Sequence, residues 1–286
     1  MSDKRELLKT EGLCFAYSSA TVLDEINLAL LPGDLVALLG PNGSGKTTLL
    51  KLLCGILTPR AGRVMWDGSD MANLRRREVA QRIAFVPQEL TVPFAFTVSE
   101  IISLGRTPYA RMLLGETKQD RAAVARATDL TGTRDLVDRY FGDLSGGERQ
   151  RAVIAMALAQ VAPGSGQPAH EHPAVLLLDE PTVHLDINHQ IEVLELIHSL
   201  NRSYGLSVLA TMHDLNLASM YFDRIILLNA GSIVAQGTPV QVLSRERIES
   251  VYGTDVVVEG HPTCRNTPQV ILLPTNGNGR EKAISS

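Results

Sequence analysis

The chain has 286 residues, of which 44% are hydrophobic and 20% are charged. This composition is ordinary for a globular protein with a sizeable core, so extended disorder and a collagen-like repeat are excluded. The 27 basic and 31 acidic residues give a formal net charge of −4, which argues against a strongly basic nucleic-acid surface.

Apolar runs of strand length alternate with amphipathic helical stretches, which predicts an α/β fold around a mostly parallel sheet. A helix is expected from about Lys46 to Ile56, and the turn at residues 229–231 is typical of a hairpin, so a small antiparallel portion is included. The predicted strands are residues 35–39, 83–86, 175–178, 206–210, 224–228 and 232–235.

Strand patterns are absent between residue 88 and about residue 160, where helices are expected at 98–104, 119–130 and 148–160. Residues 88–160 are therefore interpreted as a helical subdomain inserted into an α/β core formed by residues 1–87 and 161–255. The glycines and prolines of residues 161–174 predict a surface loop. Residues 256–286 are interpreted as a C-terminal extension.

A phosphate-binding loop is predicted at residues 40–47, which match G-x-x-x-x-G-K-[ST] between a strand and a helix. Glycines let backbone N–H groups turn toward phosphate oxygens, and the helix N-terminus adds the positive end of its dipole. Lys46 is expected to reach the β- and γ-phosphates, and the Thr47 hydroxyl to coordinate Mg²⁺. The residues predicted to bind ATP here are Gly40, Pro41, Asn42, Gly43, Ser44, Gly45, Lys46, Thr47 and Thr48.

Two carboxylates follow the apolar run 175–178. Asp179 is expected at the carboxyl edge of the sheet, where it can hold Mg²⁺. Glu180 points in a different direction and can act as general base on the attacking water.

The string Leu-Ser-Gly-Gly-Glu-Arg-Gln at residues 144–150 separates this chain from other phosphate-loop proteins. Ser145, Gly146 and Gly147 open a helix and present a hydroxyl and free N–H groups to an anion. We name residues 144–150 the signature segment, because they match the signature of ABC-type ATPases. On the strength of this match and the phosphate-binding loop, residues 5–255 resemble an ABC ATP-binding subunit. This resemblance implies a RecA-like nucleoside triphosphatase core.

The resemblance implies further site residues. Tyr17 matches the aromatic residue that stacks on adenine, with Phe15 as a weaker candidate. Gln88 matches the glutamine that senses Mg²⁺ and the attacking water. Asp186 ends the loop that crosses to the opposite subunit, and His213 matches the histidine that contacts the γ-phosphate.

Partners also follow from the resemblance. One phosphate-binding loop and one signature segment in the chain imply a homodimer with two shared ATP sites. The segment after Gln88 is expected to be exposed and to contact a permease through Phe94 and Phe96. A substrate-binding protein would act indirectly, and no nucleic acid is expected.

Segments 154–160 and 213–218 resemble those of importers for iron chelates, haem and cobalamin. No run of 18 apolar residues occurs, so the subunit is expected to be peripheral, on the cytoplasmic face of the inner membrane.

Two alternatives within the family stay open: transport of another substrate, and a soluble ABC ATPase that acts on DNA or ribosomes. The chain shows neither coiled-coil heptads nor zinc-ligand spacing, which such soluble ATPases commonly carry. Residues 75–77 are all arginine but are expected on the solvated face of a short helix. A nucleotide kinase would not explain the signature segment or His213.

Overall fold

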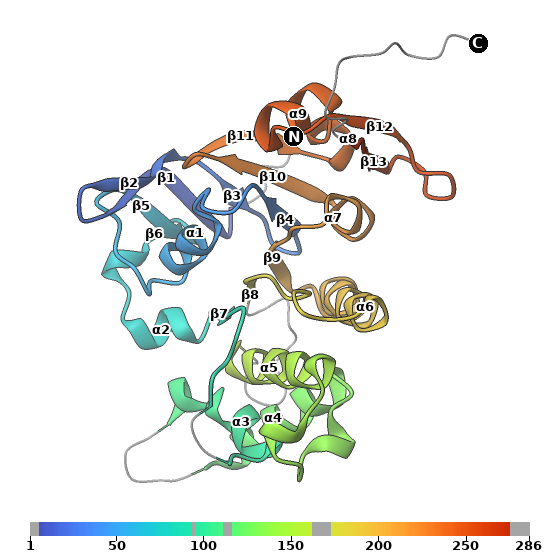
Figure 1. Ribbon diagram of the computed structural model, residues 1–286. Helices are drawn as coiled ribbons and strands as arrows, with labels where there is room; N and C mark the ends of the chain where they lie inside the picture. The colour runs from blue at the N-terminus through green and yellow to red at the C-terminus, as the bar shows by residue number, and fades with distance from the viewer. Residues whose placement is uncertain (1–5, 93–94, 111–115, 162–172, 275–286) are drawn as a thin grey trace.

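The computed structural model describes residues 6–92, 95–110, 116–161 and 173–274, which form three sheets with helices packed around them (Figure 1). The strands are β1 (Leu8–Tyr17), β2 (Ala20–Ile26), β3 (Ala29–Leu30), β4 (Leu35–Leu39), β5 (Ala61–Trp66), β6 (Ser69–Asp70), β7 (Ile83–Val86), β8 (Val175–Leu178), β9 (Ser207–Thr211), β10 (Arg224–Asn229), β11 (Ser232–Gly237), β12 (Val256–Gly260) and β13 (Pro268–Leu272). The α-helices are α1 (Lys46–Leu53), α2 (Arg76–Ala80), α3 (Val98–Leu104), α4 (Lys118–Leu130), α5 (Gly146–Val161), α6 (Ile187–Tyr204), α7 (Leu215–Tyr221), α8 (Pro239–Val242) and α9 (Arg245–Tyr252). Within these ranges, no helix combines the length and the apolar character that crossing a membrane requires.

The central sheet has six strands in the order β11-β10-β4-β9-β8-β7. All neighbouring pairs are parallel except β10 and β11, which form the predicted hairpin. The expectation of an α/β fold with a mostly parallel sheet is thereby confirmed. Every residue of β4 is buried, as expected when both faces of a parallel sheet are covered.

Alternate residues of the central sheet belong to two separate cores. Val36 and Leu38 pack with α1 and the amino-terminal strands, whereas Leu35, Ala37 and Leu39 pack with α5, α6 and α7. Figure 1 shows this arrangement, with α1 on one side of the central sheet and α6 and α7 on the other.

A five-stranded antiparallel sheet of order β2-β1-β5-β6, with β3 also paired to β1, covers α1. It is larger than the antiparallel portion expected from the sequence, and its strands were not predicted one by one. The register between β1 and β5 shifts between Glu11 and Cys14, around Gly12, whose φ is +55°. Such an irregularity interrupts the period-two pattern by which a strand is recognised in a sequence.

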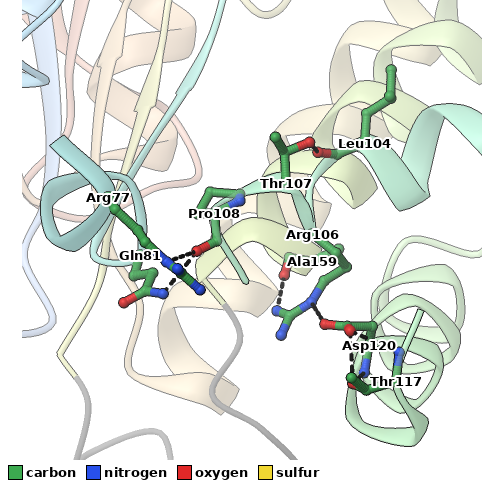
Figure 2. A network of polar contacts seen from close by, with 9 residues as sticks. All are labelled: Arg77, Gln81, Leu104, Arg106, Thr107, Pro108, Thr117, Asp120 and Ala159. Atoms are coloured by element: carbon green, nitrogen blue, oxygen red, sulfur yellow. Dashed lines mark hydrogen bonds and ion pairs between the residues drawn. The ribbon is translucent and has the colours of Figure 1, made fainter. Parts of the chain in front are cut away.

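The helices α3, α4 and α5 pack on one another beyond the β7 edge of the central sheet (Figure 1). A buried ion pair stabilises this group, because Arg106 Nε lies 2.9 Å from Asp120 Oδ1. The same guanidinium donates from Nη1 to the Ala159 carbonyl at 2.6 Å, as Figure 2 shows. Arg106 therefore joins the end of α3 to both α4 and α5.

Two further contacts connect this helical group to the core. Arg77 Nε and Gln81 Nε2 donate to the Pro108 carbonyl at 2.6 and 3.0 Å (Figure 2). Gln160 Nε2, at the end of α5, donates to the Ile83 carbonyl at 3.1 Å. Arg77 thus has a structural partner, and the short helix expected around the three arginines is observed as α2.

Two predicted segments differ from expectation or lie outside the described residues. Helix α1 ends at Leu53 instead of Ile56, because Gly55 adopts a left-handed φ of +72° that ends the helical path. The loop predicted at 161–174 lies almost wholly outside the described residues, which omit 162–172.

A C-terminal hairpin of β12 and β13 was not predicted from the sequence. It packs on α7, where Asn216 Oδ1 accepts from the Val270 amide at 2.7 Å and Asn216 Nδ2 donates to the Val270 carbonyl at 3.1 Å. Ser219 Oγ adds a bond to the Pro268 carbonyl at 2.9 Å. Part of the predicted extension is therefore folded onto the core.

Candidate functional site

Four consecutive strands of the central sheet bring the predicted site residues to one edge. In the order β4-β9-β8-β7, the strands are followed by the phosphate-binding loop, His213, Asp179 and Gln88 respectively. These strands are parallel, so their carboxyl ends meet at the same edge. Ligands of open α/β sheets bind at this edge.

Lys46 is the buried cation of the site. Its Nζ donates to the carbonyls of Gly40 and Pro41 at 2.8 and 3.1 Å, so the ammonium lies inside the phosphate-binding loop. Burial lowers the pKa of Lys46, and the nearby carboxylates of Glu180 and Asp179 oppose that shift. An anion bound in the loop would stabilise the charged ammonium further.

At two glycine positions, the phosphate-binding loop has no room for a side chain. A Cβ on Gly40 would overlap the Leu228 carbonyl, and a Cβ on Gly45 would lie 2.6 Å from Leu23 Cδ2. Both glycines also have positive φ, of 153° and 104°. The Ser44 hydroxyl is buried, and no group among the described residues bonds to it. A compact loop with an available hydroxyl and a buried cation fits a phosphate chain.

Asp179 lies at the centre of a hydroxyl network. Its Oδ1 accepts from Thr47 Oγ1 at 3.1 Å and from Thr211 Oγ1 at 2.9 Å. Asp179 is almost fully buried, and its carboxylate joins the start of α1 to the ends of β8 and β9. A hydroxyl and a carboxylate at this separation are a donor set that suits Mg²⁺.

Thr211 is a residue to which sequence analysis gave no role. Its Oγ1 accepts from the Glu180 amide at 2.7 Å while donating to Asp179, so one hydroxyl holds both carboxylate-bearing residues. The available signal in the sequence was a threonine directly after the apolar run 206–210, two positions before His213.

Glu180 has an unusual backbone and a close imidazole neighbour. Its φ is +50°, which is uncommon for a residue with a side chain and costs free energy that the surroundings must offset. Its Oε1 lies 2.5 Å from His213 Nε2. The Glu180 side chain is 14% exposed and that of His213 38%, so solvent reaches the imidazole more readily than the carboxylate.

The two aromatic candidates differ in exposure. Tyr17 is 50% exposed, whereas Phe15 is buried and meets the Tyr17 ring edge-on at 4.9 Å between centroids. Tyr17 is therefore available for stacking on a base, and Phe15 is part of the core. Gln88 is exposed beyond the end of β7.

The signature segment opens α5 with Ser145 and Gly146 both exposed. Ser145 and Glu148 form a reciprocal cap: the Ser145 amide donates to Glu148 Oε2 at 2.7 Å, and the Glu148 amide donates to Ser145 Oγ at 3.3 Å. Arg139 holds the same carboxylate at 2.9 Å. Over the described ranges, no hydrogen bond joins Ser145 to the phosphate-binding loop of its own chain.

Asp186 caps the start of α6, where its Oδ1 accepts from the His189 amide at 2.9 Å. The neighbouring Ile187 is 74% exposed, although it is a large apolar residue.

Comparison with known proteins identifies the family. A family model described as ABC transporter matches residues 23–183, which is more than half of the chain. The chain belongs to the ABC transporter family. This ABC chain is 40% identical over 273 residues to the ferric enterobactin transport ATP-binding protein of Escherichia coli (strain K12), covering 96% of each chain.

A second relative is the hemin import ATP-binding protein of Pseudomonas entomophila (strain L48), 42% identical over 265 residues, 93% of this ABC chain and 99% of the relative. Among solved structures, an ABC transporter described as of the metal-chelate type, in an inward-facing conformation, superposes with a TM-score of 0.80. It is 29% identical, and the match covers 94% of this chain and 98% of that one. The chain is therefore an ATP-binding enzyme that hydrolyses ATP, and the RecA-like core is confirmed.

The segment after Gln88 is a loop that is exposed only in part. Phe96 is half-buried and packs against the main core together with Leu90 and Val92, because the segment folds back toward the helical group. Phe94 lies outside the described residues. The expected contact of this segment with a permease therefore stays a prediction.

Proposed function

We propose that this ABC subunit hydrolyses ATP to power import of an iron chelate, haem or cobalamin through a membrane permease. The convergence of the phosphate-binding loop, His213, Asp179 and Gln88 at four neighbouring strand ends supports the catalytic part. Relatives named for ferric enterobactin transport and hemin import, similar along nearly the whole chain, support the import part.

The nucleotide is bound by residues 40–48, with Lys46 contacting the β- and γ-phosphates. Tyr17 stacks on the adenine, which its exposed ring allows. Thr47, Asp179 and Gln88 hold Mg²⁺, and the shared hydrogen bond of Thr47 and Asp179 supports that assignment. When bound, Mg²⁺ neutralises charge that develops on the phosphate oxygens.

Hydrolysis depends on Glu180 as general base. Its carboxylate takes a proton from the attacking water, and Gln88 orients that water. His213 contacts the γ-phosphate and, at 2.5 Å from Glu180, also fixes the direction of the carboxylate. Thr211 holds the Glu180 backbone in its left-handed conformation through the 2.7 Å bond.

Two subunits share each ATP site. Ser145, Gly146 and Gly147 of one subunit bind the γ-phosphate held by the other, and Asp186 crosses to the same site. Exposure of Ser145, Gly146 and Asp186 supports this role, since within the described residues none of them forms a hydrogen bond to the phosphate-binding loop of its own chain. ATP therefore closes a homodimer, and hydrolysis opens it.

The homodimer acts on the cytoplasmic face of the inner membrane, bound to permease subunits that receive cargo from a substrate-binding protein. No nucleic acid takes part. The alternative of a soluble ABC ATPase on DNA or ribosomes predicts stimulation of hydrolysis by those partners instead.

The replacement Glu180→Gln tests the catalytic proposal, because glutamine keeps the shape of the side chain and loses the base. We expect hydrolysis to fall to background while ATP binding persists, and ATP to trap a dimer visible by size-exclusion chromatography. A variant that hydrolyses ATP at the wild-type rate, or that stays monomeric with ATP, contradicts the proposal.

The import proposal is tested by reconstituting the subunit with its permease in lipid vesicles and measuring ATP-dependent uptake. Ferric siderophore, haem and cobalamin are offered separately, and Glu180→Gln serves as the inactive control. Uptake of none of the three, with hydrolysis stimulated by DNA or ribosomes, would instead support the soluble ATPase.

A further inference from the structure

The signature segment and the loop at residues 181–186, here named the crossing loop, meet within one subunit. The contact joins Gly147 of the signature segment to His189 on α6. A Cβ placed on Gly147 would lie 2.9 Å from His189 Cγ and 3.1 Å from its Cβ, and nearer still to Cδ2. Real Cβ atoms essentially never approach a neighbour below 3.0 Å, so the imidazole occupies the space that a side chain at residue 147 would need.

The His189 ring cannot easily turn away from this contact. Its Nδ1 lies 2.8 Å from Asp186 Oδ1, and the His189 backbone amide donates to the same oxygen at 2.9 Å. Rotation of the ring away from Gly147 would break the bond from Nδ1. The imidazole therefore lies between the carboxylate of the crossing loop and the backbone of the signature segment.

Neighbouring contacts hold the same two elements together. Gly146 packs against the crossing loop, since a Cβ there would lie 3.0 Å from Leu185 Cδ2. Gln190 Nε2 donates to the Leu185 carbonyl at 3.2 Å and so fixes the course of the loop. One turn farther along the two helices, Arg151 on α5 pairs with Glu192 on α6 at 2.8 Å.

We propose that His189 is a positioning residue that holds the crossing loop and the signature segment of one subunit in a fixed relation. Both elements then reach the ATP site of the second subunit as one preformed surface. Their mutual order is set before the dimer closes, which lowers the conformational cost of closing. This inference rests on the proposed function, because it requires ATP sites shared between two subunits.

A cycle of variants tests the inference in the Glu180→Gln background, where hydrolysis does not dissolve the dimer. The variants are His189→Ala, Gly147→Ala and the two combined. The dissociation constant of the ATP-bound dimer is measured by analytical ultracentrifugation, and ATP binding by the monomer is measured by fluorescence titration. Thermal unfolding establishes that each variant is folded.

We expect His189→Ala to raise the dimer dissociation constant about tenfold, which corresponds to about 1.4 kcal/mol, with ATP binding by the monomer unchanged. Gly147→Ala is expected to abolish dimerisation, because its Cβ displaces the ring. Adding His189→Ala to Gly147→Ala should restore dimerisation in part, since the added methyl group then has room. His189→Asn, which can still bond to Asp186, should lose less than His189→Ala.

A matched control is His198→Ala, which removes an exposed histidine on the same helix and should leave the dimer unchanged. An unchanged dimer dissociation constant in His189→Ala overturns the inference and leaves the proposed function intact. A Gly147→Ala defect that His189→Ala does not relieve has the same consequence. A parent Glu180→Gln protein that never dimerises with ATP overturns the proposed function and this inference with it.

Discussion

A single hydroxyl between two strand ends bonds to both carboxylate-bearing residues of the proposed catalytic site. Thr211 donates to Asp179 and accepts from the Glu180 amide, so neither residue can move without disturbing the other. Sequence patterns identify Asp179 and Glu180, because a carboxylate pair after a buried strand is a local feature. They do not identify Thr211, whose role depends on β9 lying beside β8.

Replacement of Thr211 by valine should slow hydrolysis. Valine keeps the shape of the side chain but leaves the Glu180 amide without its acceptor and removes one bond to the Asp179 carboxylate. Hydrogen bonds to charged groups contribute about 1.5–3 kcal/mol, so we expect kcat for ATP to fall about 10- to 100-fold. Thr211→Ser retains the hydroxyl and should stay close to wild type in the same steady-state assay. Equal rates for Thr211→Val and wild type would exclude this role.

At the scale of elements, regular patterns predicted most of the fold and irregular ones did not. The strands β4, β7 and β8 were predicted with their observed bounds, because parallel strands covered on both faces are continuous apolar runs. The strands of the antiparallel sheet escaped prediction where the bulge around Gly12 interrupts alternation. The burial of Phe96 depends on packing against the helical group, and no local pattern records that contact.

The buried pair of Arg106 and Asp120 is expected to stabilise the helical group. Asp120→Asn would replace the buried carboxylate beside the guanidinium with a neutral amide, and we expect the free energy of unfolding to fall by about 3 kcal/mol. Asp129→Asn is the control on the same helix. It removes an exposed partner of Arg134 and should cost under about 1 kcal/mol. Urea unfolding of both variants measures the difference, and equal losses would contradict the assignment.

The same pair predicts a dependence on pH. Burial alone would raise the pKa of Asp120, but hydrogen bonds from Thr117 and Arg106 outweigh it and lower the pKa below its ordinary value. In the unfolded chain the pKa of an aspartate is about 4. Because the folded-state pKa is lower, the carboxylate contributes its full stabilisation above about pH 4. This stabilisation is lost as the pH falls through the folded-state pKa. The stability difference between wild type and Asp120→Asn should therefore shrink below about pH 4. A difference that grows on acidification would contradict this sign.

Across the whole molecule, the candidate site has two groups of residues, and no hydrogen bond in the described ranges joins Ser145 to the group at the strand ends. The strand ends gather the phosphate-binding loop, the carboxylates and His213, whereas Ser145 lies exposed at the start of α5. The sequence predicted both halves from short motifs. The link between the signature segment and the crossing loop through His189 could not be predicted, because it depends on how α5 packs on α6.

This division is tested by mixing two inactive variants, each damaged in a different half. Lys46→Ala removes the cation of the phosphate-binding loop, and Ser145→Arg places a bulky side chain in the closed interface without touching that loop. In a mixed dimer both defects fall on one ATP site, and the other site combines an intact loop with an intact signature segment. Random exchange should restore about a quarter of wild-type ATPase activity, since half of the dimers are mixed and each has one sound site.

The control is a mixture of Lys46→Ala with Glu180→Gln, two variants damaged in the same half of the site. Every dimer in that mixture carries a defect at both ATP sites, so no activity should return. Sedimentation of the active species identifies its oligomeric state. Activity that returns only in the first mixture, and only in dimers, requires that each site be built from two chains. Activity in a monomeric species would show that one chain contains a complete site.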